Sequence, residues 1–396
     1  MCPARGAEAM EAHGIGFPSI GLSGSVLDAD RGSPRLDGIG VYTQALEREF
    51  LAQGLPVSRV SAPTLRQWIR GPGALRQPAF RYPLSLEIGL TALTGTCALG
   101  SGAVEAAVGL YHATDYLVPR LRRTPVVATV YDAIPLAHPE WANRRLRRIK
   151  NWLLRSSVSR ADLVIAISKA VVAELVEHYR IPESRIRVVP LGVDPRWMEP
   201  PPAERVRETL ARHRLQPGFF IFVGTLQPRK NLETLLAAYD RLPSRAVRER
   251  QLVVVGKYGW GAEDLRQELV RRTADGRCMW LDYVDSGVLR DLYSAAGAFV
   301  FPSLAEGYGL PVLEALGAGL PIVASDLPVL REVAGTMASY VPARDAEAMA
   351  AAMLDAVEDA QSSSVREARR AHARSADWRT CALRTAEVYR ELLRSS

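Results

Sequence analysis

The clearest indication of the fold is Ala298–Asp326, which reads AFVFPSLAEGYGLPVLEALGAGLPIVASD. Its pattern predicts a short buried strand, a loop with a carboxylate between small residues, a helix with Pro311 in its first turn, and a second buried strand from Pro321. Gly307 and Gly309 leave the loop backbone open to close approach. Because parallel sheets bind ligands at the carboxyl ends of their strands, we expect a ligand at this loop.

Two glutamates stand eight positions apart in this stretch, Glu306 in the loop and Glu314 in the first turns of the helix. Carboxylates repel phosphates, but each accepts two hydrogen bonds from a vicinal diol. We therefore expect the pair to face the hydroxyl groups of a polyhydroxylated, phosphorylated molecule. The alternative is that Glu314 only complements the helix dipole and Glu306 only caps a turn.

The bulk properties are those of a globular chain with two domains. At 396 residues, the expected domains have roughly 150 to 200 residues each. No uninterrupted apolar run is long enough to span a bilayer, and the four cysteines lack metal-type spacing, which predicts reduced thiols. Residues 1–14 contain no apolar core of a secretory signal and are predicted to be a disordered tail of a cytoplasmic protein.

Strand-like and helix-like segments alternate in both halves, which predicts an α/β fold with one doubly wound parallel sheet per half. The predicted boundaries are an N-terminal domain at 1–197, a linker at 198–215, a C-terminal domain at 216–378, and a last helix at 379–396 that packs back toward the first domain. The predicted strands are 18–22, 55–60, 107–111, 125–130, 162–167 and 186–190, then 219–223, 252–255, 279–283, 298–301, 321–324 and 339–341.

Polar residues follow several predicted strands of the first half. His112 follows the third strand, Tyr131 and Asp132 follow the fourth, and Ser168 and Lys169 follow the fifth. Since such residues gather at one edge of a parallel sheet, His112 and Asp132 are candidate site residues. The structural alternatives are a core histidine and an aspartate that caps a turn.

Two further segments offer groups for phosphate. Gly38 and Gly40 stand at the entrance of a helix expected near Val41, either as a backbone nest for phosphate or as a flexible loop. Arg229 and Lys230 precede a second helix, with Gly224 before them and Asn231 as the predicted N-cap. The planar guanidinium group of Arg229 beside the ammonium group of Lys230 suits a diphosphate better than a single anion.

A basic segment at 143–160 contains Arg144, Arg145, Arg147, Arg148, Lys150, Arg155 and Arg160. Apolar residues at helical spacing predict a helix with one cationic face. That face is either merely solvated or attached to an anionic bilayer, where each basic residue contributes ~1 kcal/mol. The net charge of +7 also suits nucleic acid, but no basic motif with interleaved aromatic residues supports that partner.

The motifs resemble glycosyltransferase family 4, a family of retaining enzymes with the GT-B fold. The pair Glu306 and Glu314, with seven residues between them, resembles the family signature over 301–315. Four further stretches resemble family motifs: Gly38-Ile-Gly-Val-Tyr, Tyr131-Asp-Ala-Ile-Pro-Leu-Ala-His-Pro-Glu-Trp, Arg187-Val-Val-Pro-Leu-Gly-Val-Asp and Phe222-Val-Gly-Thr-Leu-Gln-Pro-Arg-Lys-Asn-Leu. The resemblance covers about residues 18–395.

The resemblance implies two Rossmann-like domains that face each other across a cleft, with a nucleotide sugar held by the second and a glycan or lipid-linked acceptor by the first. Arg229 and Lys230 would neutralise the diphosphate, Glu314 would hold the ribose, and Glu306 with the amides of Gly307, Tyr308, Gly309 and Leu310 would hold the transferred sugar. His112 would lie near the reacting sugar, with Gly38, Gly40 and Gly224 at the donor. Tyr131 stands where members often have histidine, and Tyr131 and Asp132 are candidate acceptor contacts.

Within the family, the sequence is most similar to mannosyltransferases of bacterial surface-polysaccharide and lipopolysaccharide assembly, which implies GDP-mannose as donor and no metal or other cofactor. The competing classes are a GT-B nucleotide-sugar epimerase and a non-catalytic nucleotide-sugar-binding protein. An epimerase would not need the Arg-Lys pair together with both glutamates. The intact set Arg229, Lys230, Glu306 and Glu314 also argues against a protein without catalytic activity.

Overall fold

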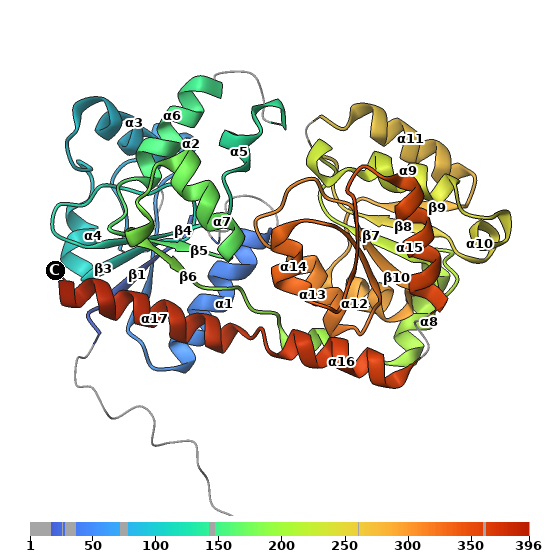
Figure 1. The fold of residues 1–396 in the computed structure, drawn as a ribbon. Coiled ribbons are helices and arrows are strands. Elements are labelled where there is room, and N and C mark those ends of the chain that lie inside the picture. The colour runs from blue at the N-terminus through green and yellow to red at the C-terminus, as the bar shows by residue number, and fades with distance from the viewer. Residues whose placement is uncertain are drawn as a thin grey trace, which may run out of the picture. The chain divides into compact units, whose positions relative to one another are not determined.

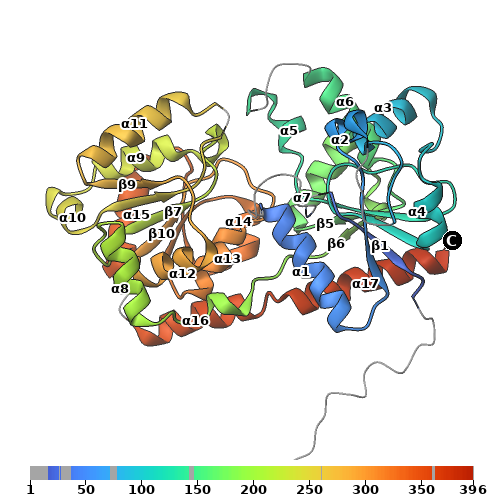
Figure 2. The ribbon, with the colours of Figure 1, turned by 180° about the vertical axis from the view of Figure 1, so that it is seen from behind.

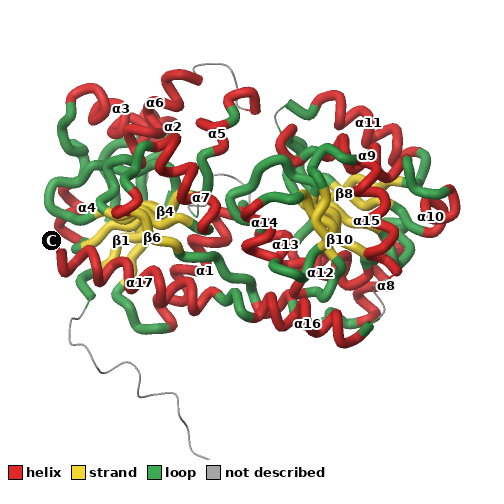
Figure 3. The backbone as a smooth tube through the Cα atoms, viewed as in Figure 1, coloured by secondary structure: helices red, strands yellow, loops and turns green. Residues whose placement is uncertain are grey.

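The structure is a computed structural model that describes residues 17–25, 27, 37–71, 78–141, 147–259, 261–358 and 362–395. These residues form two six-stranded sheets (Figures 1 and 3). The strands pair in parallel in β1–β2, β1–β3, β3–β4 and β5–β6 of the first sheet and in β7–β8, β8–β9, β7–β10, β10–β11 and β11–β12 of the second. The strand order is β2-β1-β3-β4-β5-β6 in the first sheet and β12-β11-β10-β7-β8-β9 in the second. The predicted tail at 1–14, Arg144 and Arg145 lie outside the described residues.

Short apolar runs form the strands, as predicted. The first sheet contains β1 Ile20–Ser23, β2 Val57–Val60, β3 Leu110–Ala113, β4 Val126–Val130, β5 Leu163–Ala166 and β6 Ile186–Val188; the second contains β7 Phe220–Val223, β8 Leu252–Val255, β9 Cys278–Leu281, β10 Ala298–Phe301, β11 Ile322–Ser325 and β12 Ser339–Val341.

Among the described residues, at least one α-helix lies between successive strands except between β3 and β4. The α-helices are α1 Gly38–Ala52, α2 Leu65–Arg70, α3 Leu84–Thr94, α4 Gly102–Ala107, α5 Ile134–Ala137, α6 Arg147–Val158, α7 Lys169–Glu174, α8 Ala203–Arg212, α9 Leu232–Asp240, α10 Ser244–Glu249, α11 Glu263–Ala274, α12 Ser286–Ala295, α13 Leu310–Gly317, α14 Pro328–Ala334, α15 Ala346–Glu358, α16 Ser363–Arg374 and α17 Trp378–Ser395. A 3-10 turn, η6 Pro228–Lys230, precedes α9.

The chain divides into two compact units. Unit 1 comprises 1–129, 160–163 and 386–396, and unit 2 comprises 130–159 and 164–385. The change from the first sheet to the second falls between β6 and β7, whereas the division into units leaves β5 and β6 mainly with the second half of the chain. The predicted domain boundaries and the predicted cleft therefore stay predictions.

The second sheet lies in unit 2 and has an apolar core on each face. Phe220, Phe222 and Val300 pack with residues of α9, α11 and α15 in one core. Figure 1 shows these three helices beside the second sheet. Phe299 faces the other way, where its ring contacts Tyr293 of α12 at a centroid distance of 5.8 Å. This alternation is the two-residue period of a strand that is buried on both faces.

In unit 1, helix α1 and the end of α17 pack on the first sheet. Tyr389 of α17 contacts the ring of Phe50 of α1 and the ring of His112 of β3, at centroid distances of 5.6 Å in both cases. On another side of the sheet, Phe80 meets Tyr111 edge-on. Figure 2 shows α1 and α17 from behind. The last residues of the chain therefore complete the core of its first unit.

Two predicted boundaries next to candidate site residues are wrong. Ala107 ends helix α4, and β3 begins only at Leu110, so His112 lies inside the strand, paired with Leu22 and Val127, rather than after it. Helix α1 begins at Gly38, so the two glycines form its first turn rather than a loop before it. In both cases an apolar or glycine-rich run has no periodicity that separates helix from strand or loop.

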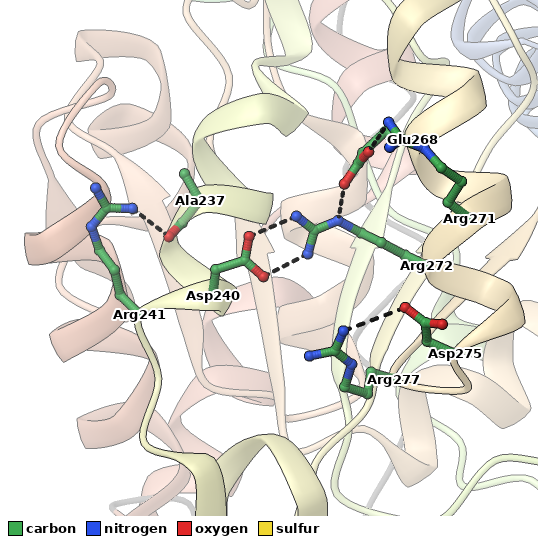
Figure 4. A network of polar contacts seen from close by, with 8 residues as sticks. All are labelled: Ala237, Asp240, Arg241, Glu268, Arg271, Arg272, Asp275 and Arg277. Carbon is green, nitrogen blue, oxygen red and sulfur yellow. Dashed lines mark hydrogen bonds and ion pairs between the residues drawn. The ribbon is translucent and has the colours of Figure 1, made fainter.

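A polar network joins the helices that cover one face of the second sheet. Arg272 of α11 donates two hydrogen bonds of 2.6 Å to the Asp240 carboxylate at the end of α9 and a third, of 2.7 Å, to Glu268 (Figure 4). Arg271 makes a further ion pair with the same Glu268. Arg272 is the better buried of the two arginines, with 19% of its side chain exposed against 76% for Arg271.

Arg272→Ala is expected to lower the free energy of unfolding by about 1 to 2 kcal/mol, because a bidentate pair between two helices is lost, and the half-exposed Asp240 limits the effect. Arg271→Ala is the matched control and should change stability by less than about 0.5 kcal/mol. Urea unfolding followed by circular dichroism measures both. Equal losses in the two variants would contradict a specific role for Arg272.

Candidate active site

The stretch Ala298–Asp326 folds into β10, a loop, α13 and β11. All four residues of β10 are buried, which fixes the strand between β7 and β11. Gly309 precedes α13 with φ of 109°, a backbone conformation that residues other than glycine rarely adopt. Pro311 lies in the first turn of the helix, as predicted. The loop 302–309 therefore has fixed ends at the carboxyl edge of the second sheet.

The neighbouring strand β7 leads to the two predicted cations. After Gly224 the chain forms η6, which contains Arg229 and Lys230. A Cβ on Gly256, which follows β8, would lie 1.9 Å from the Gly224 carbonyl oxygen, so glycine is required where these two loops meet. Gly224 thus lies at the carboxyl end of β7, as predicted, next to the loop after β8.

Asn231 precedes α9, as predicted, but it does not cap the helix with its side chain. Its backbone is left-handed, with φ of 53°, and its side-chain amide donates hydrogen bonds to the carbonyl oxygens of Pro302 and Ala343. The side-chain oxygen accepts a hydrogen bond from Thr234. Asn231 therefore ties the segment of Lys230 to the loop after β10.

Glu306 forms ion pairs with both cations. Lys230 Nζ lies 2.5 Å from Oε1 of Glu306, and Arg229 Nη1 lies 3.1 Å from Oε2. Arg229 also donates to the Ala305 carbonyl at 3.2 Å, and the Leu304 amide donates to the Arg229 carbonyl at 2.7 Å. The three charged side chains therefore form one cluster with a formal charge of +1.

Because the cluster is buried, its charges affect the pKa values of Glu306 and Lys230. The Glu306 and Lys230 side chains are each 8% exposed. Burial alone would raise the pKa of Glu306, but the charges of Lys230 and Arg229 bring that pKa below its usual value. Burial also lowers the pKa of Lys230, and the Glu306 carboxylate opposes this shift. The ring of Phe301 lies 4.7 Å from Lys230 Nζ and adds a cation–π contact.

The loop after β4 belongs to the same unit and reaches this cluster. A Cβ on Gly307 would lie 1.9 Å from the Tyr131 carbonyl oxygen and 3.2 Å from Asp132 Cβ. The Ser168 hydroxyl donates to the Gly307 carbonyl at 3.1 Å. Among the polar residues predicted at strand ends, Tyr131, Asp132 and Ser168 are thus brought to the Glu306 loop.

Asp132 is a titratable group beside the three charges. Its carboxylate accepts a hydrogen bond from the Ile134 amide at 3.1 Å. Burial raises the pKa of Asp132 to about 6; Arg229 opposes the shift, while Glu174 and Glu306 add to it. Asp132 therefore changes charge close to neutral pH.

Glu314 lies on α13 in a different environment. Burial raises the pKa of Glu314 to about 8, with Arg196 opposing. Within the described ranges, no hydrogen bond or ion pair involves its carboxylate. A protonated carboxyl group both donates and accepts one hydrogen bond, which suits a sugar hydroxyl.

The side chain of Tyr308 is buried and hydrogen-bonded within the protein. Its hydroxyl donates to the Leu191 carbonyl at 2.8 Å, and the residue is 7% exposed. A contact of Tyr308 with the nucleotide-sugar donor would therefore use its backbone, as would the contacts at Gly307, Gly309 and Leu310. These donor contacts stay predictions.

The remaining predicted site residues, Gly38, Gly40 and His112, belong to unit 1. The Asp37 side chain accepts a hydrogen bond from the Gly40 amide at 2.9 Å, so this donor of the proposed nest is occupied. His112 is fully buried, with Nδ1 2.6 Å from the Tyr389 hydroxyl and Nε2 2.8 Å from the Thr129 hydroxyl.

Burial lowers the pKa of His112 to about 3, so the imidazole is neutral. This geometry matches the structural alternative for His112, and its predicted catalytic role stays a prediction. No sequence pattern could reveal the contact, because Tyr389 lies 277 positions away.

Two absences concern only the described part of the chain. There, no three His, Cys, Asp or Glu side chains gather into a group that could hold a metal ion. No helix in the same residues is long and apolar enough to cross a bilayer. Independence from metal stays a prediction.

Comparison with known proteins gives the class. The structure matches sucrose-phosphate synthase from Thermosynechococcus elongatus with a TM-score of 0.73 at 21% identity, over 96% of this chain and 100% of that chain. This likeness confirms the predicted GT-B fold. The chain therefore has the GT-B fold, with the cluster of Arg229, Lys230 and Glu306 at the edge of its second sheet.

The sequence comparisons give the family. The profile for glycosyl transferases group 1 matches residues 218–359, and the profile for glycosyltransferase family 4 matches residues 36–197. The O-antigen chain mannosyltransferase B of Escherichia coli is 32% identical over 72% of this chain and 74% of its own length. Glycogen synthase of Mycobacterium tuberculosis (strain CDC 1551 / Oshkosh) is 28% identical over 78% of each chain.

The chain belongs to glycosyltransferase family 4. The predicted enzyme class, a hexosyltransferase, is confirmed by these comparisons. The epimerase and the non-catalytic binding protein are thereby set aside.

Proposed function

We propose that this enzyme transfers mannose from GDP-mannose, with retention of configuration, to a glycan or lipid-linked glycan of a bacterial surface polysaccharide such as lipopolysaccharide. The observation that carries the proposal is the cluster of Arg229, Lys230 and Glu306 at the carboxyl ends of β7 and β10. The similarity to an O-antigen mannosyltransferase over most of both chains supports the choice of mannose and of acceptor class.

The cluster suits the departure of a nucleoside diphosphate. The bond between the sugar C1 and the diphosphate oxygen breaks, and negative charge grows on the leaving group. Arg229 and Lys230 neutralise this charge without a metal ion, and Glu306 holds both cations in place before the reaction begins. Preorganised charge of this kind lowers the barrier because it requires no reorientation during the reaction.

Retention follows from attack on the same face of the sugar. A new bond forms between C1 and the acceptor oxygen, and the acceptor proton passes to an oxygen of the departing phosphate. No side chain in the cluster is placed as an obvious nucleophile, because Glu306 is ion-paired twice, so we favour this route over a covalent intermediate. Proton nuclear magnetic resonance of the product determines the anomeric configuration, and an inverted product would overturn the route.

A glucosyl donor is the second candidate, because the chain is also similar to a glycogen synthase over 78% of both chains. A panel of GDP-, UDP- and dTDP-sugars separates the two candidates. We expect transfer from GDP-mannose, unchanged by EDTA. Preference for a glucosyl donor would contradict GDP-mannose and support the second candidate. Loss of activity in EDTA would contradict metal independence.

Asp132 is proposed to contact the acceptor as a carboxylate. Since its pKa is about 6, the group is ionised above that pH and becomes protonated below it. The kcat/KM for the acceptor should therefore fall about tenfold for each pH unit below about 6. In Asp132→Asn the value should be low and should lose this acid limb, while donor hydrolysis keeps its pH profile. An unchanged acid limb in the variant would exclude Asp132 as its source.

We also propose that the enzyme works in the cytoplasm at the inner face of the plasma membrane, with the basic segment 143–160 in contact with anionic lipid. Its described part contains α6, where Ile149 and Trp152 are exposed beside Arg148 and Lys150. Replacing Arg147 and Arg148 by Gln should weaken binding to anionic vesicles about 25-fold, at fivefold per charge. Vesicle binding unaffected by these changes would discard this contact.

A further inference from the structure

Helix α11 and the loop after β8 border a groove on unit 2. The groove has a volume of about 490 Å³, within the range of small-molecule sites, ~300–1,000 Å³. We call it the α11 groove; its lining residues are Tyr258 of the loop and Glu263, Arg266, Gln267, Val270 and Arg271 of α11. It contains no residue of the cluster of Arg229, Lys230 and Glu306, so it is a site distinct from that cluster.

One face of α11 supplies the five helical lining residues. They lie at i, i+3, i+4, i+7 and i+8 from Glu263, which is the spacing of a single helix face. Leu265 and Leu269, on the opposite side of the helix, are buried in the core of the second sheet. The groove face of α11 therefore points outward, and Val270 is 56% exposed on it.

The backbone of Tyr258 is held by two neighbouring segments. Tyr258 forms a parallel bridge with Leu226, and the Leu226 amide donates a hydrogen bond of 2.8 Å to the Lys257 carbonyl. The Tyr258 amide donates a hydrogen bond of 3.3 Å to Oδ1 of Asp282. The ring of Tyr258 therefore extends from a fixed backbone, although it lies at the surface.

Two charged residues of α11 orient the ring of Tyr258. The guanidinium carbon of Arg266 lies 5.7 Å from the ring centroid. The Tyr258 hydroxyl donates a hydrogen bond to the Glu263 carboxylate, which lowers the pKa of Glu263 and raises the pKa of Tyr258. With these contacts made, Tyr258 is still 37% exposed. An aromatic surface that is already ordered loses little conformational freedom when a ligand binds.

The charges along the α11 groove balance each other. Glu263 and Arg266 have opposite charges on the same helix face, and Arg271 forms an ion pair with Glu268 (Figure 4). A phosphate or another anion would meet two carboxylates as well as two guanidinium groups. A neutral ligand with hydroxyl groups fits better, because carboxylate, guanidinium and amide groups can all form hydrogen bonds with hydroxyls.

We propose that the α11 groove binds a segment of a neutral glycan away from its reacting end. A sugar ring has C–H groups on its faces and hydroxyls along its edge, so it matches an aromatic surface with polar neighbours. Tyr258 and Val270 contact the face of a sugar ring, and Glu263, Arg266 and Gln267 bind its hydroxyls. The glycan as ligand rests on the proposed function, in which the enzyme extends a polysaccharide. Holding one segment raises the effective concentration of the chain end at the enzyme.

The test is affinity electrophoresis of the full-length protein in native gels with and without α-mannan. Tyr258→Ala should bind mannan about tenfold more weakly than the wild type, whereas Tyr258→Phe keeps the ring and should bind within about twofold. Arg266→Ala should bind about threefold more weakly. The matched control is Arg331→Ala, which removes an arginine 4.5 Å from the ring of Tyr340, outside the groove, and should bind as the wild type does.

Steady-state kinetics separate the α11 groove from the active site. In Tyr258→Ala, the KM for a long glycan acceptor should rise about tenfold, while kcat and both constants for a disaccharide acceptor stay at the wild-type values. Equal effects on long and short acceptors would assign Tyr258 to the reacting end and overturn the proposal. Thermal unfolding of each variant verifies the fold.

A parallel gel with glycogen makes the binding test independent of the proposed sugar. Retardation by glycogen but not by mannan, with the same loss in Tyr258→Ala, would support the α11 groove and contradict mannose as the sugar of the glycan. Retardation by neither polysaccharide, or equal retardation of the wild type and Tyr258→Ala, would overturn the proposal.

Discussion

Lys230→Ala is expected to lower kcat about 10³-fold, with a smaller change in the KM for the donor. The ammonium group is buried beside Glu306, and a preorganised cation at a leaving group is worth about two to three orders of magnitude. The effect falls on kcat because the charge on the diphosphate grows in the transition state. Steady-state kinetics at saturating donor measure it.

A double-mutant cycle of Glu306 with Lys230 tests Glu306. Glu306→Ala should also abolish most activity, because it leaves the buried Lys230 and the partly buried Arg229 as two adjacent cations that repel each other. The double variant Lys230→Ala, Glu306→Ala should lose much less than the product of the two single losses, because the residues act as one unit. Arg245→Ala, which breaks an exposed ion pair with Glu249, is the control for general loss of charge. Near-full activity of Glu306→Ala would falsify the assigned role of this residue.

Gly307→Ala is expected to reduce activity at least 100-fold and to lower the free energy of unfolding by about 1 to 3 kcal/mol. The added methyl group would lie 1.9 Å from the Tyr131 carbonyl oxygen, so one of the two loops must shift. A shift of the Glu306 loop moves its carboxylate relative to both cations, and small misplacements are costly in catalysis.

The control for Gly307→Ala is Gly89→Ala in helix α3, where a Cβ would meet no atom within 4 Å. There the substitution should stabilise the protein by up to about 1 kcal/mol, because alanine favours a helix over glycine. Thermal unfolding and kinetics are measured on both variants. A fully active and stable Gly307→Ala would contradict close packing of the loops at 131 and 307.

The positions of most strands follow from the sequence, because runs such as Phe219–Val223 and Ala298–Phe301 are short, apolar and bounded by glycine, proline or polar residues. The helix with Pro311 in its first turn also follows, since proline is fitted to that position alone within a helix. The start of β3 could not be predicted, because Ala107 to Tyr111 is apolar throughout and has neither period.

The sequence alone determined the kinds of groups in the candidate site: two cations before a helix, a carboxylate in a glycine-rich loop, and a second carboxylate eight positions on. It could not determine how these groups meet, because contacts depend on which strands are neighbours. The order β10-β7 brings Glu306 against Arg229 and Lys230, although 76 positions separate Glu306 from Lys230.

The environment of each ionisable group likewise depends on the folded structure. Burial leaves His112 neutral between Thr129 and Tyr389 and raises the pKa of Glu314 to about 8, whereas two neighbouring cations lower the pKa of Glu306. The physical reason is that charge depends on solvation and on neighbours brought from distant parts of the chain, whereas the sequence specifies only which groups are present.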